Sequence, residues 1–335
     1  MNSLELFKTQ KFYQIDISIL KDLGYDVLLS NRIFDSLLFW KYDILFSYFY
    51  RYSFFAALLA KCFGKKTYFT GGIDSLDSDY ASAFNYKIQA LFFKLCYWVA
   101  DSCIIVSQSD LKNIFKVSSL KKKLSYSEHV INTKLFIADV PKEKIFTSIV
   151  WMGDEGNVVR KGVDKALQIF AELKKIPEFV DYRFVIIGRK GEGEVLVRSI
   201  IDKYNLKGSV ELKGEVSEED KINLLKQSKY YFQLSLYEGF GLAALEALCA
   251  NNIIIHSGKG GLANPIYKEQ LLFDIDNDFD SELLKLVNKL ACFTPITSYD
   301  NLLEYYDIQR RKDDFEAIIA VSYTHLRAHE TPEHL

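Results

Sequence analysis

The chain has 335 residues, of which 49% are hydrophobic and 26% charged, with a formal net charge of −2. This balance is typical of a globular protein and excludes a disordered chain or a strongly basic nucleic-acid binder. The length favours two domains over a single core.

The charge is unevenly distributed. Residues 1–140 carry 17 basic and 13 acidic side chains (net +4), and residues 141–335 carry 25 and 31 (net −6). A mildly basic, aromatic-rich first half fits contact with an anionic membrane surface or acceptor, and ordinary solubility charge explains it equally well. Its most apolar stretch is interrupted by Lys41, Asp43 and Arg51, so membrane contact would be peripheral rather than spanning.

The cysteines and the N-terminus bear on localisation. None of the five cysteines forms a CxxC pair, and we expect all of them to be reduced core residues: Cys62, Cys96, Cys103, Cys249 and Cys292. The opening residues MNSLELFKTQK lack the apolar core of a signal peptide. We therefore expect a cytoplasmic protein, at most peripheral at the inner membrane face.

The first half alternates helices and strands. A helix over 10–23 ends at Gly24. Expected strands follow at 25–30, 43–48, 66–70 and 102–107, with helices through 56–62, over 81–100 and after the last strand. The chain opens on a helix, whereas a Rossmann-type unit normally opens on a strand and a glycine-rich turn. We therefore expect this domain to lack its first strand.

The second half alternates more clearly. Expected strands lie at 148–153, 183–188, 209–214, 230–236 and 253–257, and helices between them at 162–175, 194–206, 217–228 and 241–250. Ser217 and Asp220 form a capping box for the third helix. Regular alternation with short loops predicts a doubly wound parallel sheet.

The predicted fold class is therefore α/β with two Rossmann-like doubly wound parallel-sheet domains. The domains are expected at 1–140 and 141–320, joined near 132–146. The last residues, 321–335, hold three of the five histidines and no apolar period. We expect them to form a non-native or disordered tail rather than a metal site.

Two glutamates, Glu238 and Glu246, bracket a glycine-rich turn and the start of a helix. Eight helical residues span up to about 12 Å, which disfavours the closer carboxylate pair that glycoside hydrolysis requires. Ligands of open α/β sheets lie beyond the carboxyl ends of the strands, where Glu238 is expected.

The turn between the glutamates suits a phosphate. Gly239, Phe240 and Gly241 can turn the chain so that amides at the following helix N-terminus, near Leu242, point outwards. Glu246 would then face the same groove and accept hydrogen bonds from a ribose diol. The two carboxylates thus predict the two ends of one nucleotide sugar.

Glu238 to Glu246 matches the E-x7-E motif of GT-B glycosyltransferases, and YEGFGLAALEALCANNIIIHS resembles their retaining family 4. RKGVDKAL is similar to the family's donor-site segment, which implies that Arg160 and Lys161 hold the diphosphate. VIIGRKGEGE resembles the turn beside the nucleotide and places Gly188 there. SGKGGLANPI and VINTKLF resemble the loop after the next strand and the interdomain segment. The similarity covers most of residues 100–320.

The resemblance implies a GT-B fold, in which two domains face a cleft. It further implies a retaining glycosyltransferase that moves a hexose from a nucleotide sugar to a glycan, lipid-linked or other cell-surface polysaccharide acceptor. Glu238 would act on the donor sugar, and neither metal nor cofactor would be needed. A sugar-nucleotide epimerase of the same fold and a non-catalytic GT-B-like subunit remain alternatives.

The sequence departs from the family at three places. Asp154 follows Gly153 where the family has arginine, Asn264 stands where a glutamate is frequent, and the N-terminal glycine-rich acceptor loop is absent. Because Asp154 replaces the arginine, Arg160 and Lys161 would be the basic side chains that bind the negatively charged phosphates.

Other motifs carry weaker predictions. The DxD at 77–79 is expected to cap a helix rather than bind metal, and 274–280 lacks the glycine and glutamate of a calcium loop. Lys121–Lys123 is either a solvated run or a contact for lipid headgroups. His129 and His256 are expected to be packed rather than catalytic.

Overall fold

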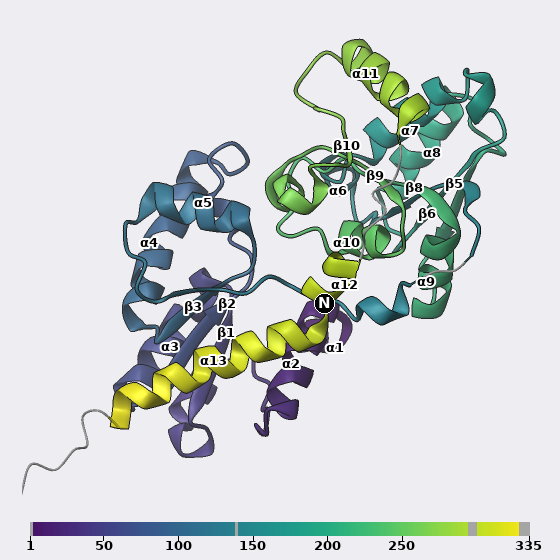
Figure 1. The fold of residues 1–335 in the computed structure, drawn as a ribbon. Helices are drawn as coiled ribbons and strands as arrows, with labels where there is room; N and C mark the ends of the chain where they lie inside the picture. The colour runs from purple at the N-terminus through teal and green to yellow at the C-terminus, as the bar shows by residue number, and fades with distance from the viewer. Residues whose placement is uncertain (1–2, 138–139, 294–299, 328–335) are drawn as a thin grey trace, which may run out of the picture. The chain divides into compact units, whose positions relative to one another are not determined.

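The computed structural model describes residues 3–137, 140–293 and 300–327. The chain divides into two compact units: Met1–Ile131 with Tyr305–Leu335, and Asn132–Glu304. They are called unit 1 and unit 2 below, and Figure 1 shows the elements of each. Both are built around a parallel sheet, which confirms the predicted α/β class.

Unit 1 has a four-stranded parallel sheet in the order β1-β2-β3-β4. The strands are β1 (Ile44–Tyr48), β2 (Lys66–Thr70), β3 (Ser102–Ile105) and β4 (Leu124–Tyr126). Phe46 pairs with Tyr68 in the β1–β2 register. The strands are short apolar runs because helices cover both faces of the sheet.

Successive strand residues point to opposite faces, and two separate cores result. Phe69, Cys103 and Ile105 pack with helices α3 (Tyr50–Cys62), α4 (Ala83–Val99) and α5 (Gln108–Val117). Tyr68 and Ile104 pack on the other face with α2 (Lys11–Asp22) and α13 (Ile308–Arg327). The first helix is α1 (Ser3–Thr9).

Helix α13 joins residues far apart in the sequence (Figure 1). Arg311 donates to both carboxylate oxygens of Asp16 on α2, at 2.6 and 2.9 Å, and to the backbone oxygens of Ser127 and Glu128. Both ionic side chains are buried, at 0% and 1% exposure. The helix continues to Arg327, so 321–327 are helical, and 328–335 lie outside the described residues.

Two sequence expectations about unit 1 are corrected. Residues 25–30 form no strand, because their backbone has no ladder partner in the described part of unit 1; Val27 packs against the α2–α13 core instead. Cys62 is exposed at the end of α3, whereas Cys96, Cys103 and Cys249 are buried as expected. The side chain of Cys292 lies outside the description.

Unit 2 has a six-stranded parallel sheet in the order β10-β9-β8-β5-β6-β7. The strands are β5 (Glu143–Ile149), β6 (Arg183–Ile187), β7 (Val210–Gly214), β8 (Ser228–Gln233), β9 (Ile253–His256) and β10 (Leu271–Leu272). The strand expected at 148–153 therefore begins and ends earlier. Its first residues, Glu143 and Lys144, are exposed and polar, which hid the start.

Four helices confirm the predicted ones: α7 (Val163–Leu173), α8 (Glu194–Lys203), α9 (Glu218–Gln227) and α10 (Leu242–Cys249). Three further helices were not predicted: α6 (Glu155–Arg160), which precedes α7, and α11 (Phe279–Cys292) and α12 (Asp300–Tyr305), which follow β10. Ser217 caps α9 by accepting from the Asp220 amide at 3.0 Å. The main core lies between the sheet and α7, α8 and α11, and includes Phe146, Phe170, Phe184 and Phe232.

No helix within the described residues is both long enough and apolar enough to cross a membrane.

Candidate functional site

The strand order of unit 2 contains a switch point. The chain moves from β5 outwards to β6 and β7, then returns to the other side of β5 with β8, β9 and β10. The carboxyl ends of β5 and β8 are therefore adjacent, while the connections that follow them diverge. Open α/β sheets bind ligands at such a point. The loop after β8 carries Glu238, and the segment after β5 leads to Arg160 and Lys161.

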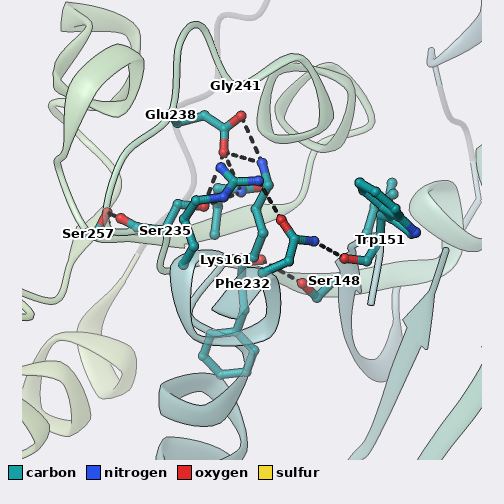
Figure 2. A network of polar contacts seen from close by, with 12 residues as sticks. Ser148, Trp151, Lys161, Phe232, Ser235, Glu238, Gly241 and Ser257 are labelled. Atoms are coloured by element: carbon teal, nitrogen blue, oxygen red, sulfur yellow. Dashed lines mark hydrogen bonds and ion pairs between the residues drawn. The ribbon is translucent and has the colours of Figure 1, made fainter. Parts of the chain in front are cut away.

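Glu238 and Lys161 meet at this switch point. The Lys161 ammonium lies 3.0 Å from Oε1 and 2.7 Å from Oε2 of Glu238. Their side chains are 21% and 17% exposed, so the pair is partly desolvated but open to one side. Figure 2 shows the Glu238 carboxylate facing Lys161.

Two buried side chains hold the same carboxylate. Gln233 Nε2 and Ser235 Oγ each donate to Glu238 Oε2 at 3.1 Å, and both residues are buried. Tyr231 in turn donates to Gln233 Oε1 at 3.2 Å. The Glu238 carboxylate is thus oriented by groups on the end of β8, as a positioned functional carboxylate requires. Gln233 and Ser235 were not predicted as site residues, although both lie just before the E-x7-E motif at the end of β8.

Arg160 lies beside the pair without joining it. Its Nη2 donates to Asn157 Oδ1 at 2.7 Å, and the side-chain Nδ2 of Asn157 donates to the carbonyl of Trp151. The Arg160 carbonyl accepts from the Leu236 amide at 2.8 Å, which fastens the turn after α6 to the loop after β8. Asp154 caps α6 by accepting from the Asn157 amide at 2.6 Å, so it has a structural use in this chain.

The N-terminus of α10 opens onto the same loop. Gly241 is its N-cap, with φ +88°, a conformation that glycine adopts without strain. The helix begins at Leu242, and the amides of its first turn have no intrahelical acceptor. Phe240 is buried at 6% exposure, and Gly239 is half-buried in the turn. Such an N-terminus is able to bind an anion.

The loop after β9 crosses directly over Glu238. The Gly261 amide donates to the Glu238 carbonyl at 2.5 Å, and Gly260 has φ +58°. A Cβ on Gly260 would lie 2.2 Å from that carbonyl oxygen, so no larger residue fits without backbone movement. These two glycines were missed as site residues, although SGKGGLANPI was recognised as a family segment.

Gly188 directly follows β6, in the turn that the sequence analysis assigned to the nucleotide. Its amide donates to the Gly214 carbonyl at 2.8 Å, and the next residue, Arg189, accepts from the Met152 amide at 2.9 Å. The turn after β6 therefore packs on the segment that follows β5.

Glu246 has a different environment from Glu238. It is 4% exposed, and its Oε2 accepts from Lys221 Nζ of α9 at 2.6 Å. Lys221 also pairs with Glu218 at 3.0 Å. Sequence reasoning missed Lys221, because its approach to α10 depends on how α9 packs. The second carboxylate is thus held by a cation, as the first is.

The motifs discounted from the sequence have local partners. Asp77 Oδ1 accepts from the Asp79 amide at 2.9 Å and its Oδ2 from Asn113 at 3.3 Å, while α4 is capped by Ser82 rather than by the DxD. Asp278 caps α11. Among the residues described, no three His, Cys, Asp or Glu side chains are placed to hold a metal ion.

Both histidines of interest are buried. Burial lowers the pKa of His256 to about 4, although a contact with the Tyr267 carbonyl at 3.2 Å opposes the shift. Burial, together with the charge of Arg311, lowers the pKa of His129 to about 3. Each is therefore neutral at pH 7.

Part of the chain is similar in sequence to known glycosyltransferases. Residues 156–290, which include the site, match the family model described as glycosyl transferases group 1. A segment of 163 residues is 32% identical to the GDP-mannose:cellobiosyl-diphosphopolyprenol alpha-mannosyltransferase of Xanthomonas oryzae pv. oryzae and covers 42% of this chain and 40% of that protein. A segment of 129 residues is 27% identical to the phosphatidylinositol N-acetylglucosaminyltransferase GPI3 subunit of Saccharomyces cerevisiae and covers 38% and 28%. The aligned segments thus span less than half of these relatives.

Solved structures resemble nearly the whole chain. Anabaena Alr3699/HepE in complex with UDP superposes with a TM-score of 0.68 at 13% identity, over 86% of this chain and 81% of that one. Sucrose-phosphate synthase from Thermosynechococcus elongatus gives 0.59 at 16% identity, over 97% and 78%.

The two parallel sheets and these likenesses define a GT-B-type fold, as the sequence predicted. Residues 156–290 resemble the group 1 glycosyl transferases, the group that the E-x7-E motif indicated.

Proposed function

We propose that this protein is a retaining glycosyltransferase that transfers a hexose from a nucleotide-sugar donor to a lipid-linked glycan acceptor without a metal. The observation that carries the proposal is the Glu238 carboxylate, held by Lys161, Gln233 and Ser235 at the switch point of unit 2. A partly buried, oriented carboxylate beside a cation and a helix N-terminus suits a ligand that joins a sugar to a diphosphate.

Each group has a distinct role in this proposal. Lys161, Arg160 and the amides at Phe240–Leu242 bind the diphosphate, whose negative charge grows as the glycosidic bond breaks. Glu238 binds the donor sugar and stabilises its developing positive charge. Glu246 accepts hydrogen bonds from the ribose, and Gly188 lines the nucleotide. The acceptor hydroxyl attacks from the face of the departing phosphate, which takes the proton.

The acceptor class is supported by the relatives. The name of the Xanthomonas relative specifies a diphosphopolyprenol-linked acceptor, and that of the yeast relative specifies phosphatidylinositol. Both are lipid-bound, and the first half of this chain is mildly basic and rich in aromatic residues. A lipid-linked acceptor would bring the protein to the inner membrane face as a peripheral enzyme.

The test begins with the donor. A thermal-shift screen against UDP-, GDP- and ADP-sugars identifies the base, and transfer of labelled sugar to polyprenyl-diphosphate glycans, with EDTA present, measures the reaction. Glu238→Gln should lower transfer about 100-fold or more and change nucleotide affinity less than about threefold, because it removes the carboxylate charge but keeps its shape. Unchanged transfer by Glu238→Gln would contradict the assigned role. Donor consumption without a transferred product would contradict the reaction itself.

A further inference from the structure

Helix α4 of unit 1 exposes a line of side chains that the proposed function does not use. The exposed residues of this line are Phe84, Lys87, Leu91, Lys94 and Trp98. Phe84, Leu91 and Trp98 are 71%, 56% and 70% exposed. We call these five residues the α4 ridge.

The spacing of the α4 ridge keeps it on one side of the helix. Steps of three and four residues place all five side chains within roughly 80° of the helix circumference, at 100° per residue. The ridge runs for about 21 Å along the axis. Apolar and basic side chains alternate along it, which is the pattern of a helix lying in a membrane interface.

The sign of the surrounding charge supports an anionic partner. Helices α3 and α4 contain no acidic residue, and they pack side by side on the same face of the sheet. Acidic residues near α4 lie before its first turn, at Asp74, Asp77 and Asp79, and after its last, at Asp101, which pairs with Lys61 and Lys66. Helix α13 on the opposite face carries Asp313, Asp314 and Glu316. Lys87 and Lys94 form no ion pair with any side chain in the described part of the chain.

A second basic segment adjoins the end of the ridge. Lys123 Nζ donates to the Trp98 carbonyl at 3.0 Å, and the Lys123 amide donates to Tyr97 Oη at 3.0 Å. The exposed Lys121 and Lys122 therefore lie next to Trp98, and the Lys121 ammonium sits 4.7 Å from the ring of Phe115. The Lys121–Lys123 run is thus attached to the C-terminal end of the α4 ridge through Lys123.

We propose that the α4 ridge and the Lys121–Lys123 run dock unit 1 onto an anionic lipid bilayer. Trp98, Leu91 and Phe84 insert at the level of the headgroups, where amphipathic aromatic side chains are favoured. Lys87, Lys94 and the lysine run bind lipid phosphates, with their aliphatic stems along the apolar side chains. The inference rests on the proposed transfer to a lipid-linked acceptor and names the surface that brings the protein to it.

The test is sedimentation of the full chain with vesicles. Phosphatidylcholine vesicles containing about one third phosphatidylglycerol should bind the protein, and pure phosphatidylcholine should bind it at least tenfold less. Lys87→Gln with Lys94→Gln should weaken binding about fivefold for each lysine removed, and Trp98→Gln should weaken it further. Lys203→Gln with Lys268→Gln, the same charge change on exposed residues of unit 2, is the matched control and should leave binding unchanged.

Fluorescence locates the contact. With Trp40→Phe and Trp151→Phe, Trp98 is the sole tryptophan, and its emission should shift to the blue and lose access to iodide on anionic vesicles. In a variant whose sole tryptophan is Trp151 of unit 2, the emission should not shift on the same vesicles.

Several outcomes overturn the proposal. They are absence of binding to anionic vesicles, binding that the two lysine changes leave intact, and a Trp98 emission that does not move. A concentration-dependent dimer that Trp98→Gln abolishes would identify a second copy as the occupant instead. Calorimetry with the cognate nucleoside diphosphate on the same preparations separates these failures from failure of the proposed function, because the nucleotide site lies in unit 2.

Discussion

The ammonium of Lys161 lies 2.7 Å from Oε2 of Glu238, between two residues 77 positions apart in the chain. In this arrangement the proposed phosphate-binding cation and the proposed sugar-binding carboxylate neutralise each other when no ligand is bound. A diphosphate that takes Lys161 as its partner would leave Glu238 held by Gln233 and Ser235, with a lone pair directed to the donor sugar.

Lys161→Met should therefore weaken binding of the nucleoside diphosphate, by about tenfold or more, since a charge-assisted contact to phosphate is removed. Isothermal calorimetry measures the change. Lys165→Met, four residues later in the first turn of α7, is the control and should bind normally. Unaltered affinity in Lys161→Met would remove this residue from the diphosphate site.

Gly260→Ala tests the crossing of the two loops. The added Cβ would meet the Glu238 carbonyl oxygen at 2.2 Å, so the backbone under the catalytic candidate must move. Transfer should fall about 100-fold, because a displacement near 1 Å is sufficient for such a loss. Gly208→Ala has a similar positive φ of +84° with open space around it, and should reduce stability alone. Equal transfer rates in both variants would show that the crossing does not position Glu238.

Glu246→Gln and Lys221→Met separate ligand binding from packing. If Glu246 accepts from the ribose, Glu246→Gln should lower nucleotide affinity, whereas the same change should matter little for the 2′,3′-dideoxy nucleotide. Lys221→Met leaves Glu246 buried without its 2.6 Å partner and should destabilise unit 2 by about 3 kcal/mol. A Glu246→Gln effect of equal size on both nucleotides would restrict Glu246 to a structural role.

Arg311→Met should destabilise unit 1 by about 3–5 kcal/mol, since it leaves Asp16 buried with the Tyr48 hydroxyl, at 2.8 Å, as its remaining side-chain hydrogen-bond donor among the described residues. Urea unfolding monitored at unit 1 measures this loss. Arg310→Met is the matched control, because the Arg310–Asp314 pair is 20% and 29% exposed and should contribute about 1 kcal/mol or less. Similar losses in the two variants would mean that burial of the pair does not matter.

Stability should fall as the pH drops from 6.5 towards 4. Burial lowers the folded-state pKa of His256 from its usual 6.5 to about 4. Between these two pH values the unfolded chain binds a proton at this residue and the folded chain does not, so protonation stabilises the unfolded state. The expected loss between pH 7 and pH 5 is about 2 kcal/mol for this residue. His256→Gln should flatten the profile of unit 2 over that range, and a profile unchanged by His256→Gln would contradict a buried neutral imidazole.

Much of the fold was predictable because its causes are local. Strands β6 and β9 and helices α7 and α10 are close to their expected bounds, since a strand buried on both faces is largely apolar and a covering helix is amphipathic. The strand predicted at 25–30 was wrong. Tyr25 and Val27 pack against the core between α2 and α13, whereas Leu28 and Leu29 are exposed, and periodicity does not distinguish this arrangement from pairing in a sheet.

The residues of the candidate site were likewise predictable only in part. The glutamates and the glycine turn were recognisable from residue type and spacing, and Arg160 and Lys161 from the resemblance of RKGVDKAL to the family's donor-site segment. Gly260 and Lys221 were not, because each acts on a residue brought to it by loop crossing or helix packing. Gln233 and Ser235 are five and three residues from Glu238, and residue type alone did not mark them as its partners.

The sequence by itself thus determined the α/β class, the parallel sheet of unit 2 and the residue types of the proposed site, since these follow from local pattern. Tertiary structure alone decided that Lys161 faces Glu238, that Lys221 holds Glu246, and that Arg311 joins α13 to α2 across 295 positions. Contacts of this kind form only when separate elements pack. Their energies depend on burial and geometry that no stretch of sequence contains.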